Sequence, residues 1–388
     1  MANRIVLNET SYHGKGAIQE IAGEVTRRGF RKAFVCSGPT LYKHGVTKKV
    51  TDVLEQAGCP YEVYTNIKEN PTIENVQDGV KAYKASGADF IVALGGGSPM
   101  DTAKAIGIII NNPEFEDVRS LEGVAPTKNP SVPIIAVPTT AGTASEITIN
   151  YVITDTEKRR KFVCVDTHDI PIVAVVDPDM MSSMPKGLTA ATGMDALTHA
   201  IEAALSKNAN PLTDKDAYWA MQAIVQNLPR AVANGQDEAA RTMMAYAENV
   251  AGMAFSNAGL GMVHAMAHAL GGHYNLPHGV CNAVLLPYVL AFNSRSPVCR
   301  ERFMTIAAAM GLQGTFTPDT AAPAVIQFVR QLSAGVGIPA NLAQLNKVDP
   351  ADFAALAELA LHDTCMSTNQ ITPTRGEVVA VYTAAFRG

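Results

Sequence analysis

The run FIVALGGGSPMDTAK at residues 90–104 decides the fold, because it reads as a buried strand, a turn of glycines and then a helix. Gly95, Gly96 and Gly97 tolerate positive φ angles and let backbone N–H groups approach an anion closely. The helix that follows offers its N-terminus to a phosphate. The run lacks the G-x-G-x-x-G fingerprint of ordinary Rossmann domains, and glycine turns also serve packing. We interpret it as a pyrophosphate cradle in an α/β domain.

The same strand-to-helix pattern repeats from about residue 30 to residue 180. Short apolar runs rich in β-branched residues predict strands. These runs are residues 32–36, 61–64, 90–94, 133–137 and 172–176. Helical patterns cover residues 45–57, 73–85 and 99–110. Repetition of this kind implies parallel pairing with right-handed crossovers, so we expect a parallel sheet between layers of helices.

A second loop of small polar residues, VPTTAGTASEIT at 137–148, follows another expected strand. Its hydroxyl groups, including Thr139, Thr140 and Thr143, suit the sugar or phosphate oxygens of a nucleotide at the carboxyl edge of a parallel sheet. The same residues would also serve as helix N-caps. Two such loops in one sheet favour a nucleotide-binding domain.

The second half of the chain has a different texture. Ala, Met and Leu recur at helical spacing after about residue 185, which predicts an all-helical region. The turn-rich segment DPDMMSSMPKG at 177–187 separates the two textures. We therefore expect two domains, an α/β domain at residues 1–184 and a helical domain at residues 185–388.

Five of the nine histidines cluster in this helical half. Asp195 and His199 lie four residues apart in GMDALTHA, and His264 and His268 repeat that spacing in MVHAMAHAL. On a helix each pair projects from one face. His278 follows in the turn NLPHG, and His273 is the fifth. Apolar helices seldom bury so many imidazoles without a partner.

A divalent metal is the partner that this pattern favours. Imidazoles and a carboxylate suit Zn²⁺ or Fe²⁺, and a site with an open position polarises an oxygen of the substrate. The residues alone leave open which of the five histidines bind the metal. They also leave open iron or zinc, and a purely structural role for the histidines.

Composition excludes several other classes of protein. The 388 residues are 47% hydrophobic and 17% charged, with a net charge of −5 and no long basic run, so nothing points to nucleic acid. No apolar run approaches the ~18 residues that cross a bilayer, and none resembles a signal peptide. Six dispersed cysteines suit a reducing compartment. We expect a cytoplasmic, soluble protein that acts on small molecules.

Three segments resemble the signatures of the iron-containing, group III alcohol dehydrogenases. They are GMVHAMAHALGGHYNLPHG at 261–279, GGGSPMDTAK at 95–104 and TTAGTASEITINYVITDTEKRRKF at 139–162. The resemblance runs nearly end to end. It implies an N-terminal α/β dinucleotide domain, then a helical metal domain, with the site in the cleft between them.

Carried over by position, the resemblance implies metal coordination by Asp195, His199, His264 and His278. It places His268 beside the substrate as a residue that does not bind the metal, and we expect this imidazole to relay the proton. The implied dinucleotide contacts are Gly95, Gly96, Gly97, Ser98, Thr139, Thr140, Thr143, Lys161 and Leu188. The implied nicotinamide or substrate pocket contains Asn150, Phe255 and Cys365.

The resemblance also implies the reaction, a reversible hydride transfer between NAD(H) and a short aldehyde or primary alcohol at Fe²⁺, with Zn²⁺ as the other metal. MANRIVLNET and NNPEFEDVRSLEG are similar to the lactaldehyde reductase branch, whereas SKNANPLTD and HAMAH are similar to 1,3-propanediol dehydrogenases. Lactaldehyde and 1,2-propanediol are the first expected pair. Alternatives are dehydrogenation of 1,3-propanediol, ethanol or methanol, a zinc enzyme like glycerol dehydrogenase, and, from another class, a metal- and NAD-dependent lyase.

Two departures from the family pattern affect these expectations. NAD-preferring relatives often place Asp after the strand at 32–36, to accept from the ribose 2′-OH, but this chain has Ser37, Gly38 and Pro39. NADP is therefore an alternative to NAD. Asn369 and Gln370 stand where relatives often have Asn-Pro. Lactaldehyde reductases are homodimers, so we also expect a homodimer.

Overall fold

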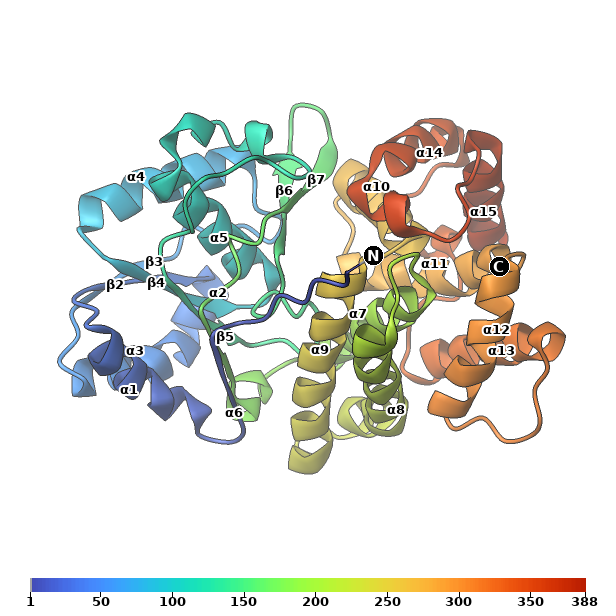
Figure 1. Cartoon of the computed structure of the whole chain (residues 1–388), viewed down its shortest axis with the longest axis horizontal. Coiled ribbons are helices and arrows are strands. Elements are labelled where there is room, and N and C mark those ends of the chain that lie inside the picture. Colours follow the sequence, from blue (N-terminus) through green and yellow to red (C-terminus); the bar gives the residue numbers. More distant parts are fainter. Residues whose placement is uncertain (1) are drawn as a thin grey trace. The chain divides into compact units, whose positions relative to one another are not determined.

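The computed structural model describes residues 2–388. The chain divides into two compact units (Figure 1, where colours run from blue at the N-terminus to red at the C-terminus). The first is Val6–Ser183, and the second is Met184–Gly388 together with the first few residues of the chain.

A six-stranded sheet forms the centre of the first unit, in the order β1-β8-β5-β4-β2-β3. Every neighbouring pair in it is parallel. Its strands are β1 Thr10–His13, β2 Ala33–Ser37, β3 Tyr61–Tyr64, β4 Phe90–Gly95, β5 Ile134–Pro138 and β8 Val173–Val176. An antiparallel hairpin, β6 Asn150–Asp155 with β7 Arg160–Val165, completes the strands of this unit. The five strands expected from the sequence are confirmed within a residue, whereas β1 and the hairpin were not expected.

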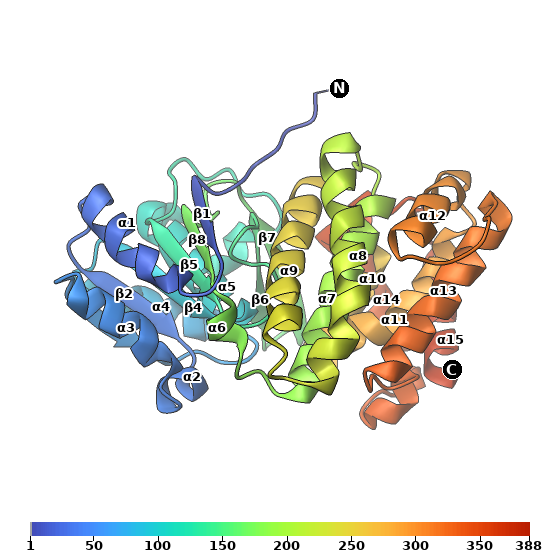
Figure 2. The ribbon, with the colours of Figure 1, turned by 90° about the horizontal axis from the view of Figure 1, so that it is seen from below.

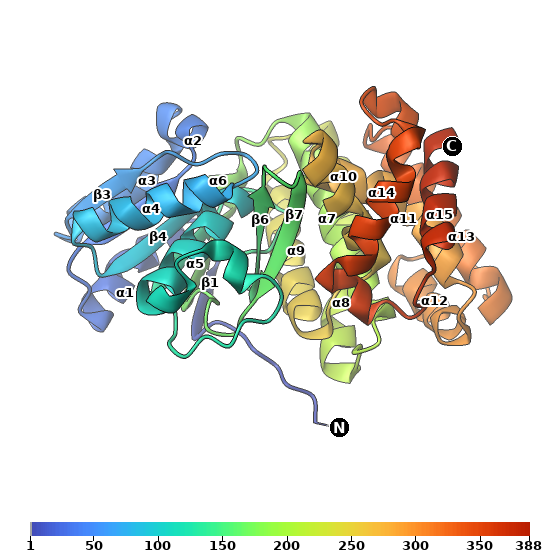
Figure 3. The ribbon, with the colours of Figure 1, turned by 90° about the horizontal axis from the view of Figure 1, so that it is seen from above.

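Helices cover both faces of this sheet. Helices α1 Glu20–Arg28 and α3 Val46–Gln56 pack on one face, in front of the strands in Figure 2. Helices α4 Ile73–Ser86 and α5 Gly97–Asn111 pack on the other, in front in Figure 3. Two short helices, α2 Pro39–Lys43 and α6 Pro178–Met181, follow β2 and β8. The three helices expected in this half are thus confirmed as α3, α4 and α5.

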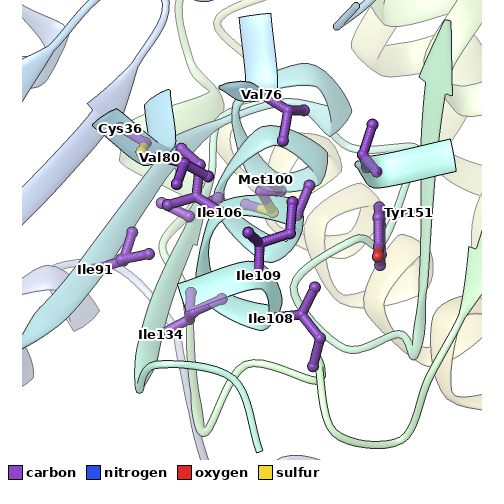
Figure 4. Close-up of a cluster of buried hydrophobic side chains, with 14 of the residues drawn as sticks. Cys36, Val76, Val80, Ile91, Met100, Ile106, Ile108, Ile109, Ile134 and Tyr151 are labelled. Carbon is purple, nitrogen blue, oxygen red and sulfur yellow. The ribbon is translucent and has the colours of Figure 1, made fainter. Parts of the chain in front are cut away.

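The core between the sheet and helices α4 and α5 is closely packed aliphatic side chains. Figure 4 shows Ile106 of α5 beside Val80 of α4 and Ile91 of β4. Gly79 helps α4 and α5 to approach closely here, because a Cβ at this position would lie 2.4 Å from the end of the Ile106 side chain. Burial of such aliphatic groups stabilises the layer by about 1.5–3 kcal/mol for each large side chain. This packing fixes α5, and therefore its N-terminus, against the end of β4.

Strand register brings three loops to one edge of the sheet. Gly95 at the end of β4 pairs with Pro138 at the end of β5, and Leu94 pairs with Ser37 at the end of β2. Because all these strands are parallel, the segments that follow them leave from the same carboxyl edge. Open α/β sheets bind their ligands at this edge.

The second unit is built of helices, which are its only regular elements in the described part of residues 184–388. They are α7 Lys186–Leu205, α8 Pro211–Ala233, α9 Glu238–Ala258, α10 Met262–Tyr274, α11 His278–Asn293, α12 Pro297–Ala309, α13 Pro318–Gly335, α14 Phe353–His362 and α15 Arg375–Arg387. The long helices α7, α8 and α9 lie side by side (Figure 2). Helix α11 packs against α7 and α10, and α10 packs against α14. The α/β-then-helical fold class expected from the sequence is confirmed.

Two chain-wide expectations also have a structural counterpart. All six cysteines are free thiols, five of them buried. A search of residues 2–388 finds no helix with the length and apolar content needed to span a bilayer.

Candidate metal centre and dinucleotide loops

Helix α7 carries the first two expected metal ligands on one buried face. Asp195 and His199 are four residues apart, as predicted, and both are at least nine-tenths buried. The helix is buried almost throughout because small residues let its neighbours approach. A Cβ at Gly193, for example, would lie 2.3 Å from Leu228 of α8.

The other expected ligands come from two consecutive helices. His264 and His268 lie on α10, as predicted, whereas His278 is the first residue of α11 and not part of a turn. The predicted turn, residues 275–279, begins correctly at Asn275, which has a left-handed φ of 52°, but it extends too far, because α11 already starts at His278. Gly279 lets α11 begin directly against α7, since a Cβ there would lie 2.4 Å from the Ala191 carbonyl oxygen.

These helices bring the four ligand candidates together. Donor atoms of Asp195, His199 and His264 lie within 4.8 Å of one another. The Asp195 Oδ1 is 3.7 Å from Nε2 of His264 and 3.7 Å from Nε2 of His278. The His199 ring stacks on His264 with centroids 4.5 Å apart. It also stacks on Phe255 of α9, with centroids 4.2 Å apart. Three of the four expected ligands therefore form one compact group, and His278 adjoins this group through Asp195.

Asn282 of α11 shows that this point suits a cation. Its side-chain amide nitrogen donates to Asp195 Oδ1 at 2.6 Å and lies 3.0 and 3.1 Å from Nε2 of His264 and His278. An amide group has two hydrogens, so it cannot donate to the carboxylate and both imidazoles at once. Its buried Oδ1 meanwhile has no hydrogen-bond partner among the described residues. A divalent cation could bind the Asp195 oxygen and the Nε2 atoms of both histidines together, so the residues fit a metal such as Fe²⁺ or Zn²⁺.

The electrostatics of the cluster match this chemistry. Burial alone would raise the pKa of Asp195, but the charges of His199 and His278 outweigh it and hold that pKa below its ordinary value. Burial would lower the pKa of His264, but hydrogen bonds to Asp195 and Glu202 raise it to about 9. Without a metal, this imidazole therefore holds a proton that a cation has to displace.

His268 lies beside this cluster and has a carboxylate partner of its own. Its ring stacks on His278 with centroids 5.2 Å apart, and its Nδ1 lies 2.9 Å from Asp363 Oδ2. The Cys365 backbone N–H donates to Asp363 Oδ1 at 2.8 Å, which fixes the carboxylate. Burial alone would raise the pKa of Asp363, but the adjacent His268 lowers it. The Cys365 thiol stays protonated, because burial and the Asp363 charge raise its pKa well above the ordinary value.

Three side chains of this unit were missed in the sequence. Asn282 and Asp363 touch the histidines as described, and Glu202 contacts Nδ1 of His264 at 2.6 Å. Only Glu202 carried a local signal, since it lies three residues after His199 on the same helix. His273, left without a role, pairs with Asp352 at 3.2 Å.

In the first unit, the glycine loop after β4 has the close approach that a phosphate cradle needs. Gly95 has φ +151°, and a Cβ there would lie 2.4 Å from Pro99. A Cβ at Gly96 would meet the Thr140 side chain at 3.0 Å, and one at Gly97 would meet Thr143 at 3.3 Å. The loops after β4 and β5 are therefore in contact, as their adjacent strands predict. The Thr140 hydroxyl is buried without a hydrogen-bond partner among residues 2–388, which leaves it available to a ligand.

The remaining expected dinucleotide residues are spread over several elements. Ser98 is in the first turn of α5 and donates to the Glu69 carbonyl, and Thr139 donates its backbone N–H to Gly95 at 2.9 Å. Lys161 lies half-buried on β7, and Asn150, which was expected in the nicotinamide or substrate pocket, begins β6 and is also half-buried. Leu188 belongs to the other unit, where it is exposed in the first turn of α7.

A buried ion pair on α5 holds the segment that leads from this loop to Asn150. Lys104 is fully buried, and its ammonium group donates to the carbonyls of Thr148 at 2.6 Å and Asn150 at 2.8 Å. Asp101, one turn earlier, accepts from the Ser145 hydroxyl at 2.9 Å, and burial raises its pKa to about 6. Asp169 lies 4.0 Å from Lys104, and burial raises the pKa of this carboxyl well above its ordinary value despite the nearby ammonium group. Together these groups fix residues 145–152.

Family models match both halves of the chain. The model described as iron-containing alcohol dehydrogenase matches residues 8–178. The model for the C-terminal part of the Fe-containing alcohol dehydrogenase family matches residues 189–386.

Individual relatives match the chain from end to end. A lactaldehyde reductase of Escherichia coli (strain K12) is 50% identical over 387 residues, which is 100% of both chains. A crystal structure of a 1,3-propanediol oxidoreductase has a TM-score of 0.95 at 41% identity and covers 100% of both chains. A sulfoacetaldehyde reductase from Bifidobacterium kashiwanohense, solved in complex with NAD⁺, has a TM-score of 0.86 at 28% identity and covers 99% of both.

Proposed function

The chain belongs to the iron-containing alcohol dehydrogenase family, and on that premise we propose that it interconverts lactaldehyde and 1,2-propanediol with NAD(H). As a member of this family it is an oxidoreductase of alcohols and aldehydes. The observation that carries the proposal is the convergence of one carboxylate and three imidazoles in a buried site beside His268. The full-length identity to a lactaldehyde reductase supports the substrate pair.

We propose that Asp195, His199, His264 and His278 hold Fe²⁺, with Zn²⁺ as the other metal that this donor set accepts. A bound divalent metal polarises the aldehyde oxygen in reduction and lowers the pKa of the alcohol in oxidation. The role of the protein is to fix the four donors on three packed helices. Asp195 also supplies the negative charge that offsets part of the charge of a divalent ion.

His268 is the proposed proton relay. Asp363 accepts from its Nδ1, so its Nε2 remains free to take or give a proton. Imidazole suits this work because its ordinary pKa lies near neutrality. Phe255, Cys365 and Asn150 are proposed to line the pocket for the nicotinamide or the substrate, and Phe255 is already fixed by its stacking on His199.

NAD(H) is the proposed carrier of the hydride. The support is the glycine loop, with its unpartnered Thr140 hydroxyl, and the likeness to a reductase solved with NAD⁺. We propose dinucleotide contacts from one set of residues. They are Gly95, Gly96, Gly97, Ser98, Thr139, Thr140, Thr143, Lys161 and Leu188. Gly38 follows β2 with open space around it and no acidic side chain, so acceptance of NADP(H) is part of the proposal.

The proposed division of labour follows the two halves of the chain. Residues 1–184 would bind the dinucleotide, and residues 185–388 would bind the metal and substrate. We also propose a cytoplasmic homodimer. The dimer rests on the resemblance to lactaldehyde reductases, and the location rests on the free thiols, which suit a reducing compartment.

The test is a substrate panel with iron-loaded protein prepared without oxygen. Loss of NADH absorbance is followed with lactaldehyde, 3-hydroxypropionaldehyde, acetaldehyde and formaldehyde, and then with NADPH. We expect the highest kcat/KM with lactaldehyde. A higher value with 3-hydroxypropionaldehyde would make the 1,3-diol the substrate, as the 41% identical structure suggests. No net change in nicotinamide absorbance with any aldehyde would favour a lyase.

A further inference from the structure

We propose that Glu202 is a positioning residue of the metal centre, whose carboxylate fixes the His264 ring in the tautomer that presents Nε2 to the metal. The inference rests on the proposed metal-dependent function. It concerns the affinity for the metal itself, so it can be tested without turnover.

The Glu202 carboxylate accepts several hydrogen bonds from the first residues of α10. Glu202 of α7 is 4% exposed. Its Oε1 accepts from the Val263 backbone N–H at 2.7 Å, and its Oε2 accepts from the His264 backbone N–H at 3.3 Å. The same Oε2 lies 2.6 Å from Nδ1 of the His264 ring. Loss of either carboxylate oxygen would leave a buried N–H group of α10 without its hydrogen-bond acceptor.

The short contact to Nδ1 determines the tautomer. A carboxylate only accepts hydrogen bonds, so Nδ1 of His264 carries the hydrogen. A neutral imidazole has a single N–H, and its Nε2 then keeps a free lone pair. That Nε2 is the atom 3.7 Å from Asp195 Oδ1, on the side where the four donors converge. Carboxylate partners of this kind orient metal-binding histidines and raise their basicity.

Glu202 also ties together the two helices that carry three of the four ligands. Helix α10 begins at Gly261 without a side-chain cap of its own. Asn369 accepts from Met262 N–H at 3.2 Å, and Glu202 takes the next two N–H groups. A Cβ at Gly261 would lie 2.8 Å from Glu202 Oε1, so the glycine is what admits the carboxylate. A negative group at this helix N-terminus is also favoured by the helix dipole.

A purely structural cap and a positioning residue predict different results for Glu202→Gln. The amide oxygen of Gln still accepts a backbone N–H, so much of the cap survives. Its NH₂ group would face Nδ1 as a donor, which selects the tautomer with hydrogen on Nε2. Such an Nε2 cannot coordinate a metal. The substitution is therefore expected to switch the His264 tautomer while it largely preserves the start of helix α10.

The experiment measures the affinity of the metal-free full chain for Zn²⁺ by competition with a chromogenic chelator. Asp363→Asn is the matched control, because it makes the same change of carboxylate to amide beside His268, which is outside the proposed ligand set. We expect E202Q to bind Zn²⁺ about 10- to 100-fold more weakly than wild type, and D363N to stay within about threefold. E202Q with wild-type affinity, or D363N with an equal loss, would overturn the proposal.

A second measurement covers the case in which E202Q does not fold. ¹⁵N-histidine spectra of the zinc-loaded wild-type protein report which ring nitrogen of His264 carries hydrogen, with His264→Asn giving the assignment. We expect hydrogen on Nδ1 and zinc on Nε2. Hydrogen on Nε2 overturns the proposal. Weak zinc binding by E202Q in a protein that reduces no aldehyde would support the positioning role and refute the proposed reaction.

Discussion

Replacing the buried Lys104 with methionine should lower the stability of the α/β unit and loosen the dinucleotide loop. Methionine fills a similar volume but donates nothing. The substitution would leave the carbonyls of Thr148 and Asn150 without their donor, and it would leave Asp169 without a cation 4.0 Å away. The position is fully buried, so water does not compensate.

The magnitude follows from these lost partners. Removing one member of a buried ion pair costs up to about 3–5 kcal/mol. Asp169 limits this cost by taking up a proton, since burial raises its pKa well above the ordinary value. Each buried carbonyl left unpaired costs about 1–3 kcal/mol, and such values do not add fully. We expect K104M to lower the free energy of unfolding by about 3–5 kcal/mol. In the double variant K104M/D169N the loss should fall to about 1–3 kcal/mol, since only the carbonyls remain unpaired.

Urea denaturation followed by circular dichroism measures these differences, with Lys84→Met on the exposed side of α4 as the control. The KM for NADH should rise in K104M, because residues 145–152 lose their anchor, while the metal content stays unchanged. K104M as stable as K84M, or a double variant less stable than K104M, would refute the reasoning.

Three further predictions concern the proton relay, the metal and the cofactor. His268→Asn should keep the metal and lower kcat by about 10²- to 10⁴-fold, which is the range for loss of a general acid–base group. Full turnover with full metal content would remove His268 from the mechanism. Metal affinity should rise about tenfold per pH unit and level off near pH 9, because the cation displaces a proton from His264, whose pKa is raised to about 9. Isothermal titrations at several pH values check this slope, and a flat profile from pH 6 to 9 would contradict it. Gly38→Asp should disfavour NADPH relative to NADH by about tenfold or more in kcat/KM, because a carboxylate there repels a 2′-phosphate, and an unchanged ratio would place the ribose elsewhere.

The buried strands were predictable because their residues are apolar on both faces of the strand. Runs such as FIVAL at 90–94 are apolar throughout, as strands covered on both faces must be, and turn residues bound them. Strand β1, TSYH, was not predictable in this way. It is short, half-buried and at the edge of the sheet, and its partner β8 lies more than 150 residues further along the chain.

The hairpin β6–β7 did carry a signal that was missed. Residues 151–154, YVIT, are aromatic or β-branched, as strand residues often are, whereas the alternation of half-buried and buried positions from Asn150 to Asp155 is visible only in the structure. The charged turn TEKR at 156–159 marks the reversal. The segment was interpreted only as a family signature, so its secondary structure was passed over.

The metal ligands were easier to find than the residues that hold them. Spacing of four placed Asp195 with His199 on one helix face, because helical periodicity is local. Asp363 meets His268 across 95 residues, and the contact depends on how α10 packs against the segment after α14. Such a partner follows from tertiary packing and leaves no pattern in the nearby sequence.

We propose that Asp195, His199, His264 and His278 hold the iron on which the reaction depends. The most direct test titrates Fe²⁺ into metal-free protein without oxygen, and follows bound iron and lactaldehyde-dependent NADH oxidation in the same samples. Activity should rise in proportion to bound iron and stop rising at about one iron per chain, and His278→Ala should abolish both iron binding and activity. Full turnover by protein shown to contain no metal, or iron binding that survives in H278A with full activity, would contradict it.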